Sequence, residues 1–325
     1  MTLLEHYKDC IALLKASVGI IDNKLVFFAS TKNIDNYRRL FVRDAIWIML
    51  AVLDINDEHL NMIAKNTLEI IEKYQRIDGA IPSNITSNGI VSYGTLSPKL
   101  DCSMLYILYK RIIDSKDKTK ENKALEYLNQ FRDNGNIISP QGGDWADEYS
   151  EEGSSLYSKV LYSIIKQDKE SIINLGKESF GKDGFAYVLA GLNLPYIELH
   201  EIPTLLYSHY PYKDAKELKN KRIHRFRFKE FAGHYHNGGI WSWYNGLYAI
   251  VLKKNNSYKR AVDILTQVMD MNNKEKKHKN IFYEYMSTIE GELKPNGVPF
   301  FACSAAGFII GYNTVIKNIK CRIGV

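Results

Sequence analysis

The chain has 325 residues, of which 45% are hydrophobic and 25% are charged, and this composition is typical of a globular protein with a substantial core. It excludes a mainly disordered chain. The formal net charge of +6 is a small excess of 43 basic over 37 acidic residues, so it does not by itself indicate a nucleic-acid partner.

The N-terminal stretch MTLLEHYKDCIALLKAS is interrupted by polar and charged residues where a signal peptide needs an apolar core. No window approaches the roughly 18 uncharged apolar residues of a membrane helix. The four cysteines lie far apart and form no CxxC pair, which indicates buried free thiols. We therefore expect a cytoplasmic protein that binds neither membrane nor nucleic acid.

Apolar residues recur at three- and four-residue spacing, the period of a helix, in nine segments. These lie near residues 2–16, 44–54, 58–74, 101–113, 121–131, 154–167, 242–253, 258–270 and 301–315. Two short alternating runs, 89–93 and 182–189, are typical of small hairpins. No linker divides the chain, so we expect one mainly helical domain over residues 1–325. Helix hairpins laid side by side would allow that domain to close into a barrel.

Two early segments place an acid at the start of an apolar helix. In YRRLFVRDAIW, residues 37–47, Arg43 and Asp44 precede an almost wholly apolar run, and Asp101 holds a similar place in PKLDCSMLYILYK, residues 98–110. Either acid can be explained as an N-terminal cap of its helix. The alternative is that the start of an inner helix also faces a pocket, where the carboxylate would bind sugar hydroxyls.

The stretch QGGDWADEYS, residues 141–150, sets three acids around a tryptophan. The two glycines permit a tight turn, and Trp145 offers a large apolar face that suits a sugar ring. Acids in a loop are more often only solvated, but an apolar neighbour can raise the pKa of a carboxyl group. Asp144 and Asp147 are therefore candidates for a catalytic acid.

Two later segments combine hydrogen-bonding groups with aromatic rings. His236 and Asn237 precede Trp241 in HYHNGGIWSWYNG, residues 234–246, and Glu284 lies between two tyrosines in IFYEYMSTIEGE, residues 281–292. Hydrolysis of a glycosidic bond needs one carboxylic acid to protonate the leaving oxygen and one carboxylate to activate water or attack directly. Such chemistry requires no metal and no cofactor.

Five motifs, FVRD, PKLDCSMLY, DWAD, YHNGGIW and FYEY, occur in this order over about residues 41–310. With them the chain resembles the alkaline/neutral invertases and the amylo-α-1,6-glucosidase domain of glycogen debranching enzymes. Trehalases and processing α-glucosidases are more distant relatives of this group. The resemblance implies an all-α fold, the (α/α)6 barrel with small irregular or hairpin insertions, and an inverting mechanism.

The resemblance also implies roles for individual residues. Asp147 is similar to the general acid and Glu284 to the general base, while Asp144 stays open as the alternative acid. The residues expected to bind the sugar, two of them as stacking walls, are Arg43, Asp44, Asp101, Asp144, Trp145, His236, Asn237 and Trp241.

The sequence thus predicts an inverting, exo-acting glycoside hydrolase for a small carbohydrate such as sucrose or a short α-glucoside. One alternative is a polysaccharide lyase or unsaturated-uronide hydrolase that uses Tyr235 or Tyr283 with His234 or His236, its basic run at 219–229 holding an acidic sugar. Another is a sugar-binding protein that has lost turnover. The number of subunits does not follow from the sequence.

Overall fold

The computed structural model describes residues 1–94, 97–140, 142–145, 155–194, 205–209, 212–220, 228–274, 280–289 and 291–324. Helices dominate these ranges, and the strands among them are short. One hydrophobic cluster runs through the helices from Tyr7 near the start of the chain to Ile323 near its end.

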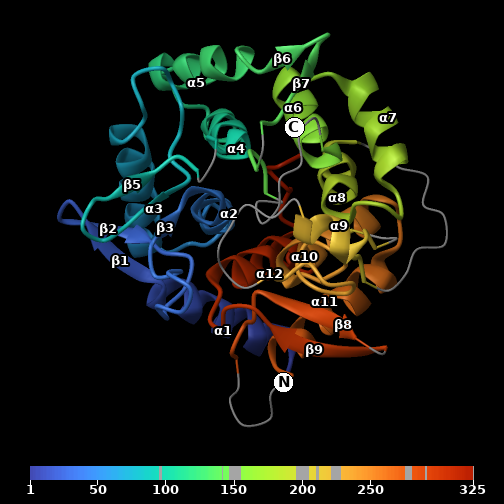
Figure 1. Ribbon diagram of the computed structural model, residues 1–325. Helices are drawn as coiled ribbons and strands as arrows, with labels where there is room; N and C mark the ends of the chain where they lie inside the picture. Colours follow the sequence, from blue (N-terminus) through green and yellow to red (C-terminus); the bar gives the residue numbers. More distant parts are fainter. Residues whose placement is uncertain are drawn as a thin grey trace.

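Six helices form a closed inner ring, which Figure 1 shows end-on. Each contacts the next around the ring, and the last returns to the first. They are α2 (Val42–Val52), α4 (Leu100–Ile112), α6 (Leu156–Lys166), α8 (Gly184–Asn193), α10 (Ser242–Lys254) and α12 (Ala302–Val315). These helices are packed on every side, and α12 is buried along its whole length.

Five further helices pack around the outside of the ring and alternate with the inner helices along the chain. They are α1 (Leu3–Ala16), α3 (Glu58–Lys73), α5 (Thr119–Asn129), α7 (Lys169–Ser179) and α11 (Tyr258–Asn272). Because each outer helix runs back along the barrel, consecutive inner helices are parallel. The predicted (α/α)6 barrel is confirmed.

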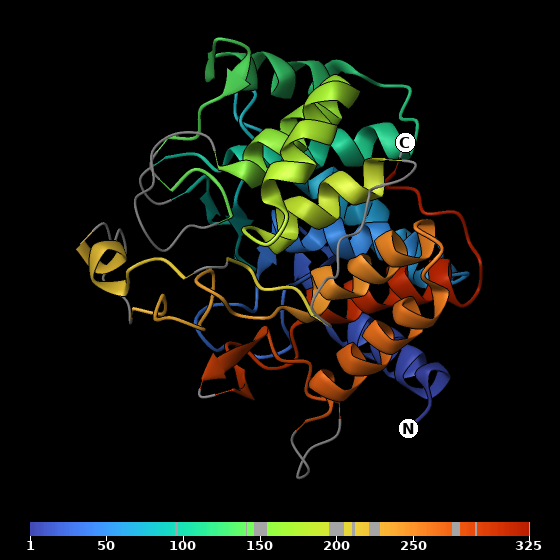
Figure 2. The same ribbon diagram turned by 90° about the vertical axis from the view of Figure 1, so that its right-hand side faces the viewer.

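The connection from α8 to α10 differs from the other connections between inner helices. Within the described parts of residues 194–241 the only helix is the short α9 (Ala215–Asn220), which lies at the loop end of the barrel (Figure 2). The C-terminal segment packs against the C-terminal ends of α8 and α10, with Cys321 and Ile323 buried and Gly324 against the Leu192 carbonyl of α8. Lys254 of α10 donates a hydrogen bond to the same carbonyl.

The strands form four small antiparallel groups in the connections. These are β1 (Val18–Ile21) with β2 (Lys24–Phe27), β3 (Leu40–Phe41) with β4 (Asn84–Ile85) and β5 (Val91–Ser92), β6 (Arg132–Asp133) with β7 (Asn136–Ile137), and β8 (Tyr285–Ile289) with β9 (Glu292–Asn296). The predicted strand at 89–93 is thus present as β5. The hairpin predicted at 182–189 is wrong, because this segment belongs to α8.

Backbone contact joins α10 to α12. A Cβ atom on Gly246 would lie 2.5 Å from the carbonyl oxygen of Gly307, and one on Gly307 would collide with the backbone of Trp243. Only hydrogen fits at these positions, so the glycines set the distance between the two helices.

The outer helix α1 packs against α12 and α11. His6 is fully buried here and contacts the rings of Phe282 and Phe308. Asn272 Nδ2 lies 3.1 Å from its Nε2, and Asn273 Nδ2 lies 3.3 Å from its Nδ1. The N-terminal helix is therefore joined to the segment that leads into Glu284.

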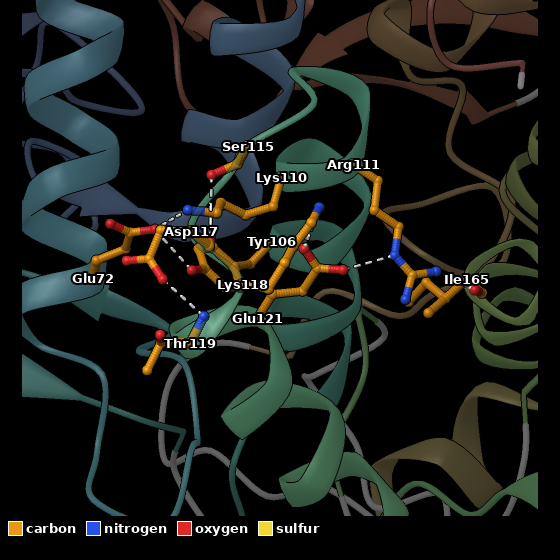
Figure 3. Close-up of polar contacts among 10 residues, drawn as sticks. All are labelled: Glu72, Tyr106, Lys110, Arg111, Ser115, Asp117, Lys118, Thr119, Glu121 and Ile165. Atoms are coloured by element: carbon orange, nitrogen blue, oxygen red, sulfur yellow. Dashed lines mark hydrogen bonds and ion pairs between the residues drawn. The ribbon is translucent and has the colours of Figure 1, made fainter.

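A polar cluster joins outer to inner helices between α3, α4, α5 and α6 (Figure 3). Lys110 Nζ lies 2.7 Å from Glu72 Oε1, which also accepts a hydrogen bond from Tyr106 at 2.8 Å. Arg111 Nε lies 2.9 Å from Glu121 Oε1, and the same guanidinium donates to a carbonyl of α6. Lys110 and Glu121 are buried, so pairing compensates their desolvation.

Candidate active site

A cavity of about 670 Å³ lies where the inner helices begin. Residues in or next to the first turns of α2, α4, α10 and α12 line it, and the β8–β9 hairpin contributes Tyr285 and Asn296. The loops at this end lie on the left of Figure 2. Helix N-termini carry partial positive charge, so several of them directed at one cavity favour carboxylates and other oxygen-rich groups there.

Glu284 is a carboxylate fixed in the cavity wall, and it is only 1% exposed. Its Oε1 accepts a hydrogen bond from the Tyr37 hydroxyl at 2.6 Å, and its Oε2 accepts one from the Val298 backbone N–H at 3.1 Å. Gly297 has a positive φ of 75°, and a Cβ atom there would collide with this carboxylate. The carboxylate therefore has one position, set by its donors and by the glycine.

Tyr37 also faces the cavity. Burial and the neighbouring carboxylate of Glu284 raise the pKa of Tyr37 well above its usual value. The phenol consequently stays protonated and donates its hydrogen to Glu284.

Arg43 and Asp101 form a pair at the floor. Arg43 Nε lies 2.5 Å from Asp101 Oδ2, and the Tyr157 hydroxyl lies 3.3 Å from the same oxygen. Asp101 is fully buried and is not among the residues that line the cavity, whereas Arg43 is. Of the two predicted sugar ligands, only Arg43 is therefore open to a ligand, and Asp101 orients it from behind.

Asp44 lines the cavity beside Arg43, as the prediction of a pocket-facing acid requires. The simpler interpretation of both acids as N-caps is wrong. The N-cap residues are Phe41 for α2 and Lys99 for α4, neither with a side-chain cap, and Asp44 and Asp101 lie inside the first helical turns. Acids there are still stabilised by the helix dipole.

The predicted stacking residues form one aromatic wall. Trp145, His236 and Trp241 all line the cavity and are buried. The rings of His236 and Trp241 are parallel within 3°, with centroids 5.7 Å apart. Trp145 meets the His236 ring edge-on at 4.5 Å.

Asn237 takes a different place from the one predicted. Its Oδ1 accepts from the Lys213 N–H at 2.7 Å, and its Nδ2 donates to the carbonyls of Lys213 and Glu230 at 3.0 Å each. The residue is 1% exposed and is not part of the cavity lining. It holds the surrounding loops together instead of facing a ligand.

Of the two candidate catalytic acids, only Asp144 lies in the described part of the chain. Asp147 lies outside the described residues. Asp144 is described, and its Oδ2 accepts a hydrogen bond from Ser158 of α6 at 3.5 Å. Its backbone carbonyl accepts from Arg43 and from Lys99. Asp144 is not among the residues that line the cavity.

Backbone strain gathers next to the cavity. Tyr235 has φ 42°, Phe282 has φ 51° and Phe300 has φ 55°, although bulky residues rarely adopt positive φ. Such conformations cost roughly 1–3 kcal/mol each and are found mainly at functional sites.

Three residues of this site were not singled out from the sequence: Tyr37, Glu230 and Gly297. Glu230 is fully buried behind His236. Each of the three lies in a segment that was interpreted in another way. Tyr37 begins the motif YRRLFVRDAIW, which drew attention for Asp44, and Gly297 ends KPNG, which was interpreted as an ordinary turn. Glu230 lies in a run of basic residues.

In the part of the chain that the structure describes, no three His, Cys, Asp or Glu side chains gather as metal ligands would. Cys102 and Cys303 line the cavity, and burial raises the pKa of both thiols. No helix in the described ranges is both long and apolar enough to cross a membrane.

No protein-family model and no curated protein matches this sequence. Solved structures do match in fold. A glycosidase variant in complex with glucose aligns over 96% of both chains with a TM-score of 0.61 and 11% identity.

Two further structures of this kind have known ligands. A GH63 mannosylglycerate hydrolase from Thermus thermophilus in complex with glucose aligns over 94% of this chain and 99% of its own, with a TM-score of 0.54 and 12% identity. A bacterial glucoamylase complexed with acarbose aligns over 98% of this chain and 56% of its own, with a TM-score of 0.58 and 14% identity. At these identities the matches establish the shared barrel fold.

Proposed function

We propose that this chain is an inverting, exo-acting glycoside hydrolase for a small carbohydrate, with the barrel acting as one catalytic domain. The observation that carries the proposal is the carboxylate of Glu284, held by two donors in the wall of an aromatic-lined cavity. A carboxylate with fixed orientation supplies one of the two carboxyl groups that glycosidic hydrolysis needs. The folds shared with glycosidases support the same chemistry.

Glu284 is proposed as the general base and Asp147 as the general acid. The hydrogen bonds to Glu284 Oε1 and Oε2 fix the orientation of its carboxylate, which a base that activates water requires. Asp147 follows Trp145, a cavity-lining residue, by two positions in the sequence. In an inverting enzyme the two carboxyl groups would stand roughly 6.5–9.5 Å apart, leaving room for the attacking water.

A small sugar is the proposed substrate class. The cavity of about 670 Å³ is within the roughly 300–1,000 Å³ typical of small-molecule sites. Arg43 and Asp44 at its floor offer a donor and an acceptor for hydroxyls, and the wall of Trp145 and Trp241 offers apolar faces. The motifs shared with alkaline/neutral invertases and amylo-α-1,6-glucosidase domains favour sucrose or a short α-glucoside.

The test is a product assay of the purified protein against sucrose, trehalose, maltose, isomaltose and uronic oligosaccharides. Glu284→Gln and Asp147→Asn should each nearly abolish release of free sugar while sugar binding survives. Glu292→Gln changes an exposed acid on β9 and should leave the rate unchanged. Proton NMR of the first product should show the anomer opposite to the substrate's.

Either active-site variant retaining wild-type activity would remove that residue from the mechanism. The same anomer in product and substrate would mean retention, with Glu284 or Asp147 attacking directly.

A polysaccharide lyase or unsaturated-uronide hydrolase is the second candidate, favoured by cations near tyrosines in the cavity. Lys229 Nζ lies 4.9 Å from the centroid of the Tyr235 ring, and Arg39 also lines the cavity. These groups suit an acidic sugar. Activity restricted to uronic oligosaccharides, with an ultraviolet-absorbing product from a lyase, would favour this candidate over the first.

A further inference from the structure

A carboxylate is buried directly behind the aromatic wall. Glu230 is fully buried, and its Oε1 lies 3.1 Å from Nδ1 of His236, which is 4% exposed. An ionised carboxylate can only accept hydrogen bonds, so Nδ1 of the imidazole must carry the hydrogen in this contact. In its neutral form, His236 is therefore held in the tautomer with hydrogen on Nδ1.

Burying the second carboxylate oxygen of Glu230 costs free energy of folding. Glu230 Oε2 is buried and has no hydrogen-bond partner among the described residues. Leaving such an atom unsatisfied is costly because its desolvation is not compensated, and the cost is larger for a charged group, so an apolar side chain here would be expected if stability alone mattered. The cost indicates a role beyond packing.

The surrounding loop fixes Glu230 from the backbone side. Asn237 donates one hydrogen bond to the Glu230 carbonyl and joins the same loop to Lys213 by two more. Tyr235, between the two, is held at φ 42°. The carboxylate, its backbone and the imidazole are thus positioned together.

The other ring nitrogen of His236 remains available. Nε2 makes no hydrogen bond within the described parts of the chain, yet it is not among the buried atoms that lack a partner. The ring itself lines the cavity between Trp145 and Trp241. In the neutral imidazole with hydrogen on Nδ1, Nε2 has a lone pair that can accept a hydrogen bond.

We propose that Glu230 is a positioning residue that keeps hydrogen on Nδ1 of His236, so that Nε2 accepts a hydrogen bond from a hydroxyl of the bound sugar. The sugar in this statement rests on the proposed function, whereas the tautomer does not. The stacking of His236 on Trp241 fixes the ring plane, and Glu230 fixes its direction within that plane.

The first experiment measures the tautomer without any substrate. Nitrogen-15 NMR of histidine-labelled protein should show Nδ1 protonated and Nε2 unprotonated for His236, with the signal assigned by its loss in His236→Asn. In Glu230→Gln the amide can accept from or donate to Nδ1, and in Glu230→Leu no acceptor remains, so both variants should show mixed tautomers. The exposed-site control Glu126→Gln should match the wild type.

Hydrogen on Nε2 in the wild type, or an unchanged spectrum in both Glu230 variants, would overturn the inference. Two variants are used because Glu230→Gln preserves side-chain shape if Glu230→Leu fails to fold.

The second experiment uses the sugar. On the glycoside that the wild type hydrolyses, Glu230→Gln should lower kcat/KM about 10- to 100-fold, mainly through KM. Adding it to His236→Asn should cause no further loss, because Glu230 acts only through the imidazole. If the double variant instead lost kcat/KM by the product of the two single losses, Glu230 would act by another route and the proposal would be overturned.

If the wild type hydrolyses nothing in the panel, the proposed function fails but this inference is still decided. Glucose at saturating concentration should shift the Nε2 resonance of His236 in the wild type. An unshifted resonance would overturn the role of Nε2 as a sugar acceptor.

Discussion

Acidification should destabilise this protein through His6 on α1. Its ring is fully buried against Phe282 and Phe308, and both nitrogens face side-chain amides. Burial lowers the pKa of His6 from 6.5 to about 4 in the folded protein. The folded state thus resists taking up the proton that the unfolded chain binds readily.

The difference between the folded and unfolded pKa of His6 sets the sign and the size of the change in unfolding free energy with pH. Above the unfolded pKa of about 6.5, His6 is neutral in both states, and its full contribution to stability is present. As the pH falls, only the unfolded chain is protonated, so the free energy of unfolding decreases until the pH reaches the folded pKa of about 4. A shift of about 2.5 units corresponds to at most about 3.4 kcal/mol, of which about 2 kcal/mol is lost between about pH 7 and pH 5.

The assay is urea unfolding followed by circular dichroism at about pH 7 and pH 5. His6→Gln has no titrating ring and should lose about 2 kcal/mol less than the wild type over this interval. His59→Gln, on the exposed side of α3, is the matched control and should behave as the wild type does. Equal pH dependence of the wild type and His6→Gln would refute the reasoning.

Three further substitutions test other parts of the structure. Gly307→Ala must push α12 away from the α10 backbone, so we expect a loss of about 1–3 kcal/mol in urea unfolding; an unchanged midpoint would contradict the close contact. Tyr37→Phe removes a donor from Glu284, which should lower kcat about 10- to 100-fold in steady-state kinetics with the fold intact by circular dichroism; an unchanged kcat would exclude this role. Lys110→Ala removes the ammonium partner of Glu72, which is partly exposed and keeps its hydrogen bond from Tyr106, and should lower the unfolding free energy by about 1–3 kcal/mol, whereas the loss should be much smaller for the exposed Lys15→Ala.

Sequence periodicity predicted most of the helices, including α12, which is buried along its whole length, but it missed the outer helix α7 and the inner helix α8. The outer helices α1 and α3 lie where the apolar spacing indicated them. α8 was taken for a hairpin because it is a short, buried run of 10 residues, and periodicity alone does not separate such a run from a buried strand.

The sequence predicted which residues gather at the site better than it predicted which of their side chains face the cavity. Glu284, Arg43 and His236 do line one cavity, as their motifs indicated. Asp101 and Asn237 lie just behind the wall, and nothing local in the sequence separates a side chain that faces a ligand from one that supports it. That difference arises from loops far apart in the chain, as in the contact of Asn237 with Lys213.

The packing of α1 against α12 joins the two ends of the described chain, so α1 is completed long before its partner helix during synthesis. Tyr7 of α1 stacks on Tyr312 of α12, and Cys10 and Leu14 are fully buried in the finished ring. During translation at about 5–20 residues per second, α1 would wait roughly 15–60 s before α12 emerges to cover it. Until then the nascent chain carries an uncovered apolar stripe, so added chaperones should raise the yield of folded protein.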